Sequence, residues 1–328
     1  MAELIAAPRA AALLARMTNR RVVVVGDVMI DEWIWGDVSR ISPEAPVPVV
    51  AVRDHSFTLG GAGNVASNLR ALGAHVAFVG GIGDDAEGAR LRAMFDDLGV
   101  DAHGLVTLRD RPTTRKTRIV AHSQQVVRAD WESTAPLHDD DRARIVDAVR
   151  LALRDADAVV LSDYAKGLLH REIVEAALGA PVVVADPKPK NVAMFAGVTC
   201  IAPNVGEAAR ASGIAITDDA SLDRAARALQ QQLGCRYVLV TRGEHGMSLF
   251  GEGHERFDVP AVARTVFDVS GAGDTVVAVL TLALAAQIPA ETATQLANFA
   301  AGAVVEKLGT ATASPSEIVA LMEHGHAG

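Results

Sequence analysis

An acid that directly follows three small residues is the most chemically informative feature of the sequence. Residues 268–280 read DVSGAGDTVVAVL, in which the acid is Asp274 and the small residues are Gly271, Ala272 and Gly273. A glycine loop that opens a helix leaves backbone N–H groups unpaired, and the helix dipole favours an anion there. An acid beside an anion site is explained if it takes the proton of a hydroxyl that attacks a phosphoryl group. In this hypothesis Asp274 is a general base, and the three preceding amides stabilise the transferred phosphate.

A plainer interpretation of the same segment is an ordinary helix start. In that case Asp274 is a first-turn acid, which the helix dipole stabilises without any chemistry. The segment alone leaves both interpretations open, so the rest of the chain must decide between them.

The elements that would position this segment follow an alternating pattern. Runs rich in β-branched residues predict buried strands at Arg21–Ile30, His75–Gly80, Ala158–Ser162, Pro181–Asp186 and Arg236–Thr241. Helical patterns lie between them at Ala62–Leu72, Asp85–Leu98, Asp139–Arg154 and Ser221–Leu233. Alternation of strands and helices at this spacing predicts an α/β fold, with a parallel sheet covered by helices on both faces.

Two stretches interrupt this rhythm. Val47–Phe57 and Thr113–Asp130 alternate apolar and polar residues, which is typical of antiparallel strands, and His122–Gln125 could turn a hairpin. They predict either a small separate sheet, a lid, or edge strands of the main sheet. Ile41–Val50 contains three prolines and should run extended rather than helical.

Composition narrows the class of protein. The chain has 328 residues, half of them hydrophobic, and a formal net charge of −9. These values favour a large buried core and disfavour nonspecific binding to nucleic acid. They do not exclude a phosphorylated small substrate, because a local basic pocket can override net charge.

Three features of the sequence bear on where in the cell the protein is found. Cys200 and Cys235 form no CxxC pair, so a disulfide framework or a structural zinc site is not expected, and two reduced thiols suit a cytoplasmic protein. Residues 276–287 form the most apolar helical stretch and are too short to cross a membrane. The first 21 residues predict a short amphipathic helix, with a signal peptide as the alternative.

Four segments together resemble the PfkB carbohydrate kinases. DVSGAGDTVVAV resembles their C-terminal signature, and GGAGN at Gly60–Asn64 with GGIGDD at 80–85 resembles their N-terminal signature. PNVGE at Pro203–Glu207 is similar to their N-x-x-E motif, and TRGEHGM at Thr241–Met247 is similar to their nucleotide-binding segment. The matches occur in family order and cover nearly the whole chain. Val279 departs from the glycine of many members, which puts no chemical role in doubt.

This resemblance implies a fold and a set of roles. The implied fold is a ribokinase-like three-layer α/β/α sandwich, a single domain over 1–328 with lid strands inserted at about 33–57 and 113–130. Asp274 corresponds to the base, and Gly271, Ala272 and Gly273 to the anion hole. The implied sugar contacts are Asp31, Gly60, Gly61 and Asn64. The implied nucleotide contacts are Asn204, Glu207, Thr241, Gly243, Gly246, Asp268 and Asn298, of which Asn204 and Glu207 would also organise Mg²⁺ through water.

The carried-over roles make physical sense. Asp31 follows the first predicted strand, where open parallel sheets bind ligands, and a carboxylate can accept hydrogen bonds from two sugar hydroxyls. Gly60 and Gly61 would let the backbone approach a ligand closely. Taken singly, Asp31 is equally well a solvated loop acid, and Glu207 a surface helix acid.

A closer resemblance concerns the substrate. Asp27–Asp31, Ser39–Val50 and Thr113–Asp130 resemble the heptose-7-phosphate kinases of lipopolysaccharide core synthesis. That resemblance implies transfer from ATP, with Mg²⁺, to O1 of D-glycero-β-D-manno-heptose 7-phosphate; a monovalent cation is a further candidate cofactor. A phosphorylated substrate needs cations, and the candidates are Arg53, Lys116, Arg118, Arg128, Lys188 and Lys190. Lys116 and Arg118 are two residues apart on a predicted strand and should share a face.

Some members of that subfamily carry a second, nucleotidyl-transferring domain, and this chain resembles the stand-alone kinase. Members often pair through their lids, so a homodimer is expected. The expected partner is a small phosphorylated sugar, with no nucleic acid and no membrane.

Motifs that would indicate other functions are imperfect or absent. Gly81–Ala86 imitates a dinucleotide-binding turn, but Asp84 and Asp85 would repel a pyrophosphate. A P-loop, an H-E-x-x-H and a G-x-S-x-G motif are all absent from the sequence. A ribokinase, a fructokinase, a ketodeoxygluconate kinase or a non-catalytic sensor on the same fold stays open.

Overall fold

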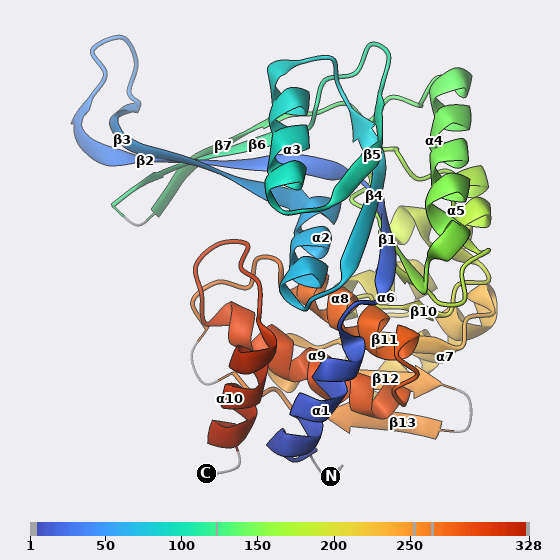
Figure 1. Cartoon of the computed structure of the whole chain (residues 1–328). Helices are drawn as coiled ribbons and strands as arrows, with labels where there is room; N and C mark the ends of the chain where they lie inside the picture. The colour runs from blue at the N-terminus through green and yellow to red at the C-terminus, as the bar shows by residue number, and fades with distance from the viewer. Residues whose placement is uncertain (1–4, 123, 252–253, 264–265, 326–328) are drawn as a thin grey trace.

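The fold was determined as a computed structural model, which describes residues 5–122, 124–251, 254–263 and 266–325. Within these residues the strands form two sheets, one of nine strands and one of four (Figure 1). Seven parallel strands of the large sheet lie in the spatial order β5 (Asp101–Thr107), β4 (His75–Ile82), β1 (Arg21–Gly26), β8 (Ala158–Ser162), β9 (Val183–Asp186), β10 (Cys200–Ile201) and β11 (Tyr237–Thr241). Two antiparallel strands, β12 (Met247–Gly251) and β13 (His254–Val259), complete it.

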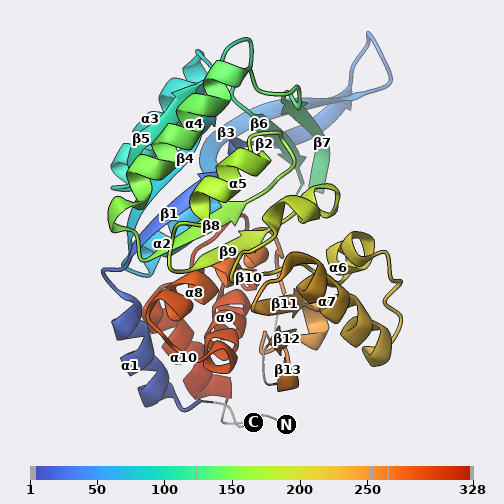
Figure 2. The same ribbon diagram turned by 90° about the vertical axis from the view of Figure 1, so that its right-hand side faces the viewer.

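Helices cover both faces of the large sheet, as Figures 1 and 2 show. One face carries α1 (Ala7–Met17), α2 (Ala62–Ala71), α8 (Ala272–Ala285), α9 (Ala290–Val305) and α10 (Pro315–Gly325). The other carries α4 (Asp139–Ala152), α5 (Arg171–Ala177), α6 (Val205–Ser212) and α7 (Asp219–Leu233), while α3 (Ala86–Asp97) lies beside β5 and the small sheet. Short 3₁₀ turns occur at Leu153–Asp155, Pro189–Phe195 and Gly243–His245. The predicted three-layer α/β/α architecture is therefore confirmed.

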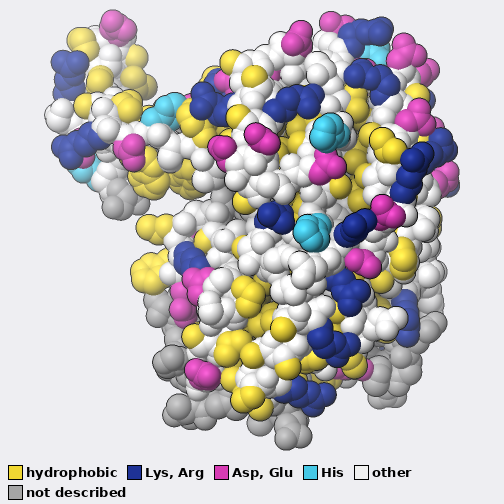
Figure 3. Space-filling view, viewed as in Figure 1, with side chains coloured by type: hydrophobic (Ala, Val, Ile, Leu, Met, Phe, Trp, Pro, Cys, Tyr) yellow, Lys and Arg dark blue, Asp and Glu magenta, His cyan; other side chains and the backbone are white. Residues whose placement is uncertain are grey.

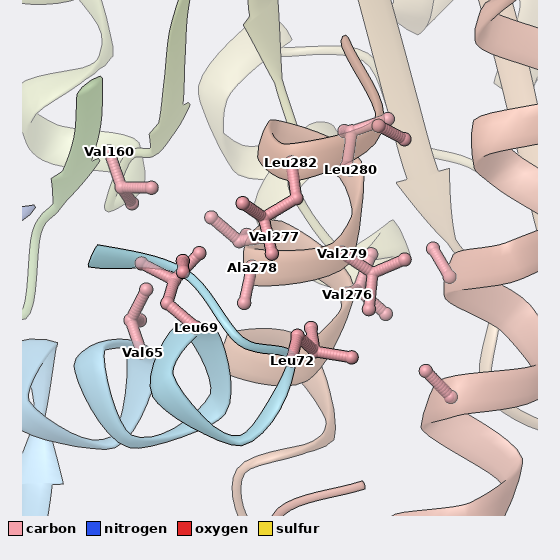
Figure 4. Close-up of a cluster of buried hydrophobic side chains, with 14 of the residues drawn as sticks. Val65, Leu69, Leu72, Val160, Val276, Val277, Ala278, Val279, Leu280 and Leu282 are labelled. Carbon is pink, nitrogen blue, oxygen red and sulfur yellow. The ribbon is translucent and has the colours of Figure 1, made fainter. Parts of the chain in front are cut away.

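Two hydrophobic clusters, one on each face of the sheet, explain why the strands are apolar at every position. In β1, Val22 and Val24 belong to one cluster, and Val23 and Val25 to the other. Successive side chains of a strand point to opposite faces, so a strand covered on both sides must be apolar throughout. On the first face, Val65 and Leu69 of α2, with Leu72 just after it, pack against the valine-rich α8, as Figure 4 shows. This contact fixes the start of α8, and hence Asp274, relative to α2.

The predicted strand Arg21–Ile30 is wrong as a single element, because the chain changes sheets at Asp27. β1 ends at Gly26, and the next strand begins at Val28 in the small sheet. Gly26 has no room for a side chain, since a Cβ there would collide with the carbonyl of Ser162. The buried Asp27 carboxylate instead accepts hydrogen bonds from three backbone N–H groups of the loop after β8. The chain therefore leaves the large sheet at the carboxyl end of β1.

The small sheet is the predicted lid. Its order is β3 (Pro48–Gly61), β2 (Val28–Ile41), β6 (Arg115–Ala121) and β7 (Gln124–Trp131). β2 and β3 pair as a long antiparallel hairpin that projects from the body of the molecule (Figure 1). The β6–β7 hairpin pairs with β2 in parallel; its predicted turn at His122–Gln125 includes residue 123, which lies outside the described residues. The proline-containing stretch 42–47 forms bends between β2 and β3 rather than one extended segment.

Other features agree with the composition. Cys200 and Cys235 are both free and buried, and burial raises the pKa of the Cys235 thiol to about 11. The amphipathic helix predicted near the N-terminus is α1. Among the helices of the described ranges, none combines the length and the apolar character needed to cross a membrane.

Candidate active site

Polar residues gather at the carboxyl edge of the parallel strands, where open α/β sheets bind ligands. Asp27, Asp163 and Asp186 follow or end β1, β8 and β9, and Thr241 ends β11. A cavity of about 150 Å³ opens at this edge. The residues that line it include Tyr164, Asp186, Lys188, Asn204, Glu207, Thr241, Gly271, Gly273 and Asp274. The acid and the glycines singled out in the sequence thus face one cavity.

Asp274 is buried in the first turn of α8 and is held at both carboxylate oxygens. The Tyr164 hydroxyl donates to its Oδ1 at 2.6 Å, and Asn64 Nδ2 donates to its Oδ2 at 2.7 Å. Burial raises the pKa of Asp274 to about 6, even though the two hydrogen bonds and the nearby Lys188 lower it. A carboxylate with a pKa just below neutrality is ionised at pH 7 and is a stronger base than an exposed aspartate.

The three small residues form the helix start that the anion-hole hypothesis requires. Gly271 is the N-cap of α8 with φ +80°, a conformation that glycine adopts without strain. A Cβ on Gly271 would lie 2.6 Å from Asn64 Nδ2, so a larger residue would displace a hydrogen-bond donor of Asp274. A Cβ on Gly273 would meet no atom within 4 Å, which leaves its backbone open to a ligand. Ala272 is the first helical residue between them.

The predicted sugar contacts lie together beside Asp274. Asn64, on α2, bonds Asp274 directly. Asp31 is buried in β2, and its negative charge raises the pKa of Asp274 further. Gly60 leaves room for the Asp31 carboxylate, which a Cβ there would strike. Gly61 has a backbone reason to be glycine, since it caps α2 with φ +59° and lies against the carbonyl of Asp27.

Three of the predicted phosphate-binding cations share one face of the lid. In the strand register Lys116 lies opposite Asp31 and Asp130, and Arg118 lies opposite Arg128. Arg118 pairs with Asp31 at 2.5 Å, and Arg128 pairs with Asp130 at 2.8 Å. These two cations are already neutralised by neighbouring carboxylates.

The side chain of Lys116 has neither a hydrogen bond nor an ion pair with any described residue. Its ammonium is partly buried, and burial lowers its pKa, as do the positive charges of Lys166 and Arg128, although Asp31 and Asp130 oppose them. Lys166 pairs with Glu132 at 2.5 Å. Lys116 is thus a half-buried cation beside other cations.

The remaining predicted cations lie elsewhere. Arg53 pairs with Asp37 on the exposed part of the lid. Lys188 lines the cavity at the other end, where its Nζ lies 2.6 Å from Glu207 and 3.9 Å from Asp186. Lys190 is exposed in the 3₁₀ turn after β9 and does not line that cavity.

The N-x-x-E segment forms the start of α6. Asn204 accepts from the N–H of Glu207, and Glu207 accepts from the N–H of Asn204, which is a reciprocal capping box. The other Glu207 oxygen accepts from Lys188. Asp186 faces the same space, and burial, with the charges of Glu207 and Asp274, raises its pKa to about 7 despite Lys188. Both carboxylates border the cavity in front of the α8 helix start.

The other predicted nucleotide residues hold loops in place. Thr241 pairs with Asn204 in an isolated parallel bridge. Gly243 and Gly246 have φ of +58° and +81°, and a Cβ on Gly246 would collide with the backbone after β13. Both therefore serve the turn between β11 and β12.

Asp268 and Asn298 also act on the backbone. The Asp268 carboxylate accepts from the N–H groups of Ser270 and Gly309, which lower its pKa although partial burial opposes them. Asn298, buried in α9, donates to the carbonyl of Pro260. Each joins segments that flank the start of α8.

Three residues of the site were not predicted from the sequence: Tyr164, Lys166 and Asp186. All three follow or end parallel strands, so their position at the carboxyl edge was the available signal. The dinucleotide-binding interpretation of Gly81–Ala86, which the sequence already disfavoured, gains no support, because Asp85 is the N-cap of α3 and accepts hydrogen bonds from Gly88 and Thr113. Its carboxylate already accepts from an N–H group of the helix start, which is where a dinucleotide-binding turn would hold phosphate.

Comparison with solved structures shows the fold. A ribokinase from Arabidopsis thaliana, complexed with ribose and ATP, aligns with a TM-score of 0.73 at 21% identity, over 93% of this chain and 99% of that chain. Phosphofructokinase-2 from Escherichia coli, in complex with potassium, aligns with a TM-score of 0.80 at 18% identity, over 94% of this chain and 100% of that chain.

Comparison of sequences is more specific. The chain is 47% identical to the bifunctional protein HldE of Desulfatibacillum aliphaticivorans over 92% of its own length and 63% of that protein. It is 46% identical to HldE of Citrifermentans bemidjiense over 94% of its length and 65% of that protein. The chain thus spans slightly less than two thirds of these relatives. Residues 19–317 match the pfkB family carbohydrate kinases. This chain therefore belongs to the pfkB family of carbohydrate kinases, phosphotransferases whose acceptor is a sugar hydroxyl.

Proposed function

We propose that this chain transfers the γ-phosphate of ATP to O1 of D-glycero-β-D-manno-heptose 7-phosphate, giving the 1,7-bisphosphate used in lipopolysaccharide core synthesis. The proposal rests on the resemblance of Asp27–Asp31, Ser39–Val50 and Thr113–Asp130 to heptose-7-phosphate kinases. Relatives named HldE at 40–47% identity support it. Those relatives are named bifunctional, and the proposal for this chain covers a kinase activity alone.

The observation that carries the choice of a phosphorylated sugar is the charge balance on the inner face of the lid. Four cations, Lys116, Arg118, Arg128 and Lys166, face three carboxylates, Asp31, Asp130 and Glu132. Each carboxylate already has an ion-pair partner, so Lys116 only shares the field of Asp31 and Asp130 and leaves the group with one excess positive charge. A half-buried cation without a partner is costly unless an anion binds it. A phosphate on the far end of the sugar would supply that anion.

The residues at the α8 end suit ATP and Mg²⁺. The N–H groups at the glycine helix start can hold phosphate oxygens, and Lys188 can neutralise charge there. Mg²⁺ binds through one or two carboxylates, waters and substrate phosphates, and Asp186, Glu207 and Asn204 provide a donor set of this kind. When bound, Mg²⁺ would neutralise charge that develops on the phosphates. A requirement for a monovalent cation stays a prediction, which activity in K⁺ against Na⁺ tests.

In the proposed mechanism the sugar lies between the lid and α8. Asp31 accepts hydrogen bonds from its hydroxyls, and Lys116 binds its phosphate. Asp274 accepts the proton of O1 as O1 attacks the γ-phosphorus in line, while the amides of Gly271–Gly273 stabilise the transferred group. Closure of the lid over the sugar excludes water, which would otherwise take the phosphoryl group.

We also propose a homodimer formed through the lids. Large hydrophobic side chains are exposed on the projecting strands, including Trp35, Ile41, Val52 and Val127. Figure 3 shows hydrophobic and basic side chains together on this arm. An exposed edge of this length is usually covered by a partner. Sedimentation of the wild type and of Val52→Lys tests the proposal: a monomeric wild type would refute it.

The experiment that tests the function is ATP consumption with Mg²⁺ across a panel of sugars. The panel contains heptose 7-phosphate, sedoheptulose 7-phosphate, fructose 6-phosphate, ribose, fructose and ketodeoxygluconate. Turnover confined to the heptose phosphate, with the new phosphate at C1, is the expected result. Turnover of an unphosphorylated sugar would retain the kinase and discard the role of Lys116. Silence across the panel would favour a sensor.

A further inference from the structure

The loop after β8, residues 163–168, is held more firmly than a connecting loop requires. The Asp27 carboxylate accepts from the N–H groups of Tyr164, Lys166 and Leu168 at 2.9, 3.0 and 3.1 Å. Asp163 accepts from the N–H of Ala165 at 2.7 Å, and Ala165 has a φ of +57°. A non-glycine residue in this conformation costs free energy and persists only where its surroundings fix it. Two buried acids therefore hold one strained loop in a single conformation.

The side chain that this loop delivers to the site is Tyr164. Its hydroxyl donates to Oδ1 of Asp274 at 2.6 Å. Burial raises the pKa of Tyr164 well above its usual value, and the negative charges of Asp274 and Asp186 raise it further. The phenol therefore stays protonated wherever Asp274 is ionised, and it is a permanent donor to the carboxylate.

We propose that Tyr164 is a positioning residue, whose hydroxyl holds the Asp274 carboxylate in the orientation from which it accepts the proton of the sugar hydroxyl. The inference rests on the proposed role of Asp274 as base. With Tyr164 on one oxygen and Asn64 on the other, the carboxylate cannot rotate without losing a hydrogen bond. Each carboxylate oxygen can accept a second bond, so an acceptor site is left for the substrate. By fixing the loop, Asp27 and Asp163 thus also fix the Tyr164 hydroxyl that orients Asp274.

The titratable groups around Asp274 come from three strands and the loops that follow them. Tyr164 follows β8, Lys188 follows β9, Asp186 ends β9, and Asp31 lies in β2. Of these groups Tyr164 alone both donates a hydrogen bond to Asp274 and stays neutral. Its removal should therefore disfavour the ionised carboxylate without changing the net charge of the site.

The chain contains two tyrosines, Tyr164 and Tyr237, which allows a direct measurement. Protein labelled with 3-fluorotyrosine should give two ¹⁹F resonances, assigned with Tyr237→Phe. As the pH rises without any ligand, the Tyr164 resonance should shift with the ionisation of Asp274, whose pKa is about 6. The step near pH 6 should vanish in Asp274→Asn, which leaves only a weaker response to Asp186, whose pKa is about 7. A Tyr164 resonance that does not titrate, or that titrates equally in Asp274→Asn, would overturn the inference.

Kinetics supply a second test with a matched control. Tyr164→Phe keeps the ring and removes the hydroxyl. It should lower kcat about tenfold or more, and it should move the acidic limb of the kcat profile up by about one pH unit, because a hydrogen bond to a charged group is lost. Tyr237→Phe, on β11, should change neither quantity.

The outcomes separate this inference from the proposed function. An unmoved acidic limb in a folded Tyr164→Phe would overturn the positioning role. If that variant fails to fold, the fluorine titration of the wild type still decides. Because that titration uses no sugar, failure of heptose 7-phosphate as a substrate would refute the proposed function and leave the positioning role to be judged separately.

Discussion

Replacing Asp274, the proposed base, with asparagine should stabilise the protein increasingly as the pH rises. Burial raises the pKa of Asp274 from 3.8 to about 6. A carboxyl group with a raised folded-state pKa contributes its full stability below the unfolded-state pKa and loses it as the pH rises through the folded-state pKa. An asparagine side chain cannot ionise, so the Asp274→Asn variant should avoid that loss. Its stability relative to the wild type should therefore rise between pH 4 and pH 8.

The size of the effect follows from the pKa difference. About 2 pKa units at about 1.4 kcal/mol each give an upper bound of about 3 kcal/mol, most of it between pH 4 and pH 8. With an unfolding entropy of about 2 cal/mol/K per residue over 328 residues, this corresponds to about 4 °C in Tm. The asparagine also loses a hydrogen bond from Asn64, at a cost that does not depend on pH. The change with pH, rather than the absolute difference, is therefore the quantity to measure.

Thermal and urea unfolding of the unliganded wild type and Asp274→Asn at several pH values supply the measurement. Asp268→Asn is a control of opposite sign, because hydrogen bonds hold the pKa of Asp268 below its usual value. The Asp268 carboxylate stabilises the fold above its unfolded-state pKa, and this contribution is lost as the pH falls. The stability of Asp268→Asn relative to the wild type should therefore decrease as the pH rises. An Asp274→Asn offset that is equal at pH 4 and pH 8 would refute the reasoning.

Two further substitutions test the anion hole and the phosphate subsite. Gly271→Ala should destabilise the protein by about 1–2 kcal/mol through its left-handed backbone and also lower kcat, because the new Cβ displaces Asn64. Gly213→Ala, also at positive φ but with open space around its Cβ, should cost similar stability and leave kcat unchanged. If the two variants have the same kcat, the contact of the residue 271 side chain with Asn64 does not affect catalysis. Lys116→Met should raise KM for the phosphorylated sugar about 10- to 100-fold, whereas the exposed Lys190→Met should not. A KM for the phosphorylated sugar equal to that of the wild type in Lys116→Met would refute the proposed role of Lys116 in binding phosphate.

The sequence predicted those helices and strands that depend on residues close together along the chain. Apolar runs and helical periodicity located most of the parallel strands and their helices, and small residues before Asp274 located the helix start. The split at Asp27 was missed because Arg21–Ile30 is uniformly apolar apart from one acid. Only the loop after β8, some 140 residues away, shows that this acid accepts hydrogen bonds that fix the loop.

Candidate site residues were predictable by type, and their partners were not. A count of basic residues could not show that Arg118 pairs with Asp31, 87 positions away, while Lys116 has no such partner. Tyr164 belongs to none of the motifs that the sequence suggested. Its role depends on a contact with Asp274, 110 residues further along the chain. Long-range contacts of this kind have no signature in a single sequence.

The most direct test of the central claim is the turnover of Asp274→Asn, together with its affinity for ATP. If Asp274 is the base, kcat should fall by about 10²–10⁴ while the Kd for ATP changes little, since the nucleotide is held by backbone amides and by residues of other elements. Turnover close to that of the wild type would contradict the account. An equal loss of ATP binding would show instead that Asp274 holds the nucleotide site together.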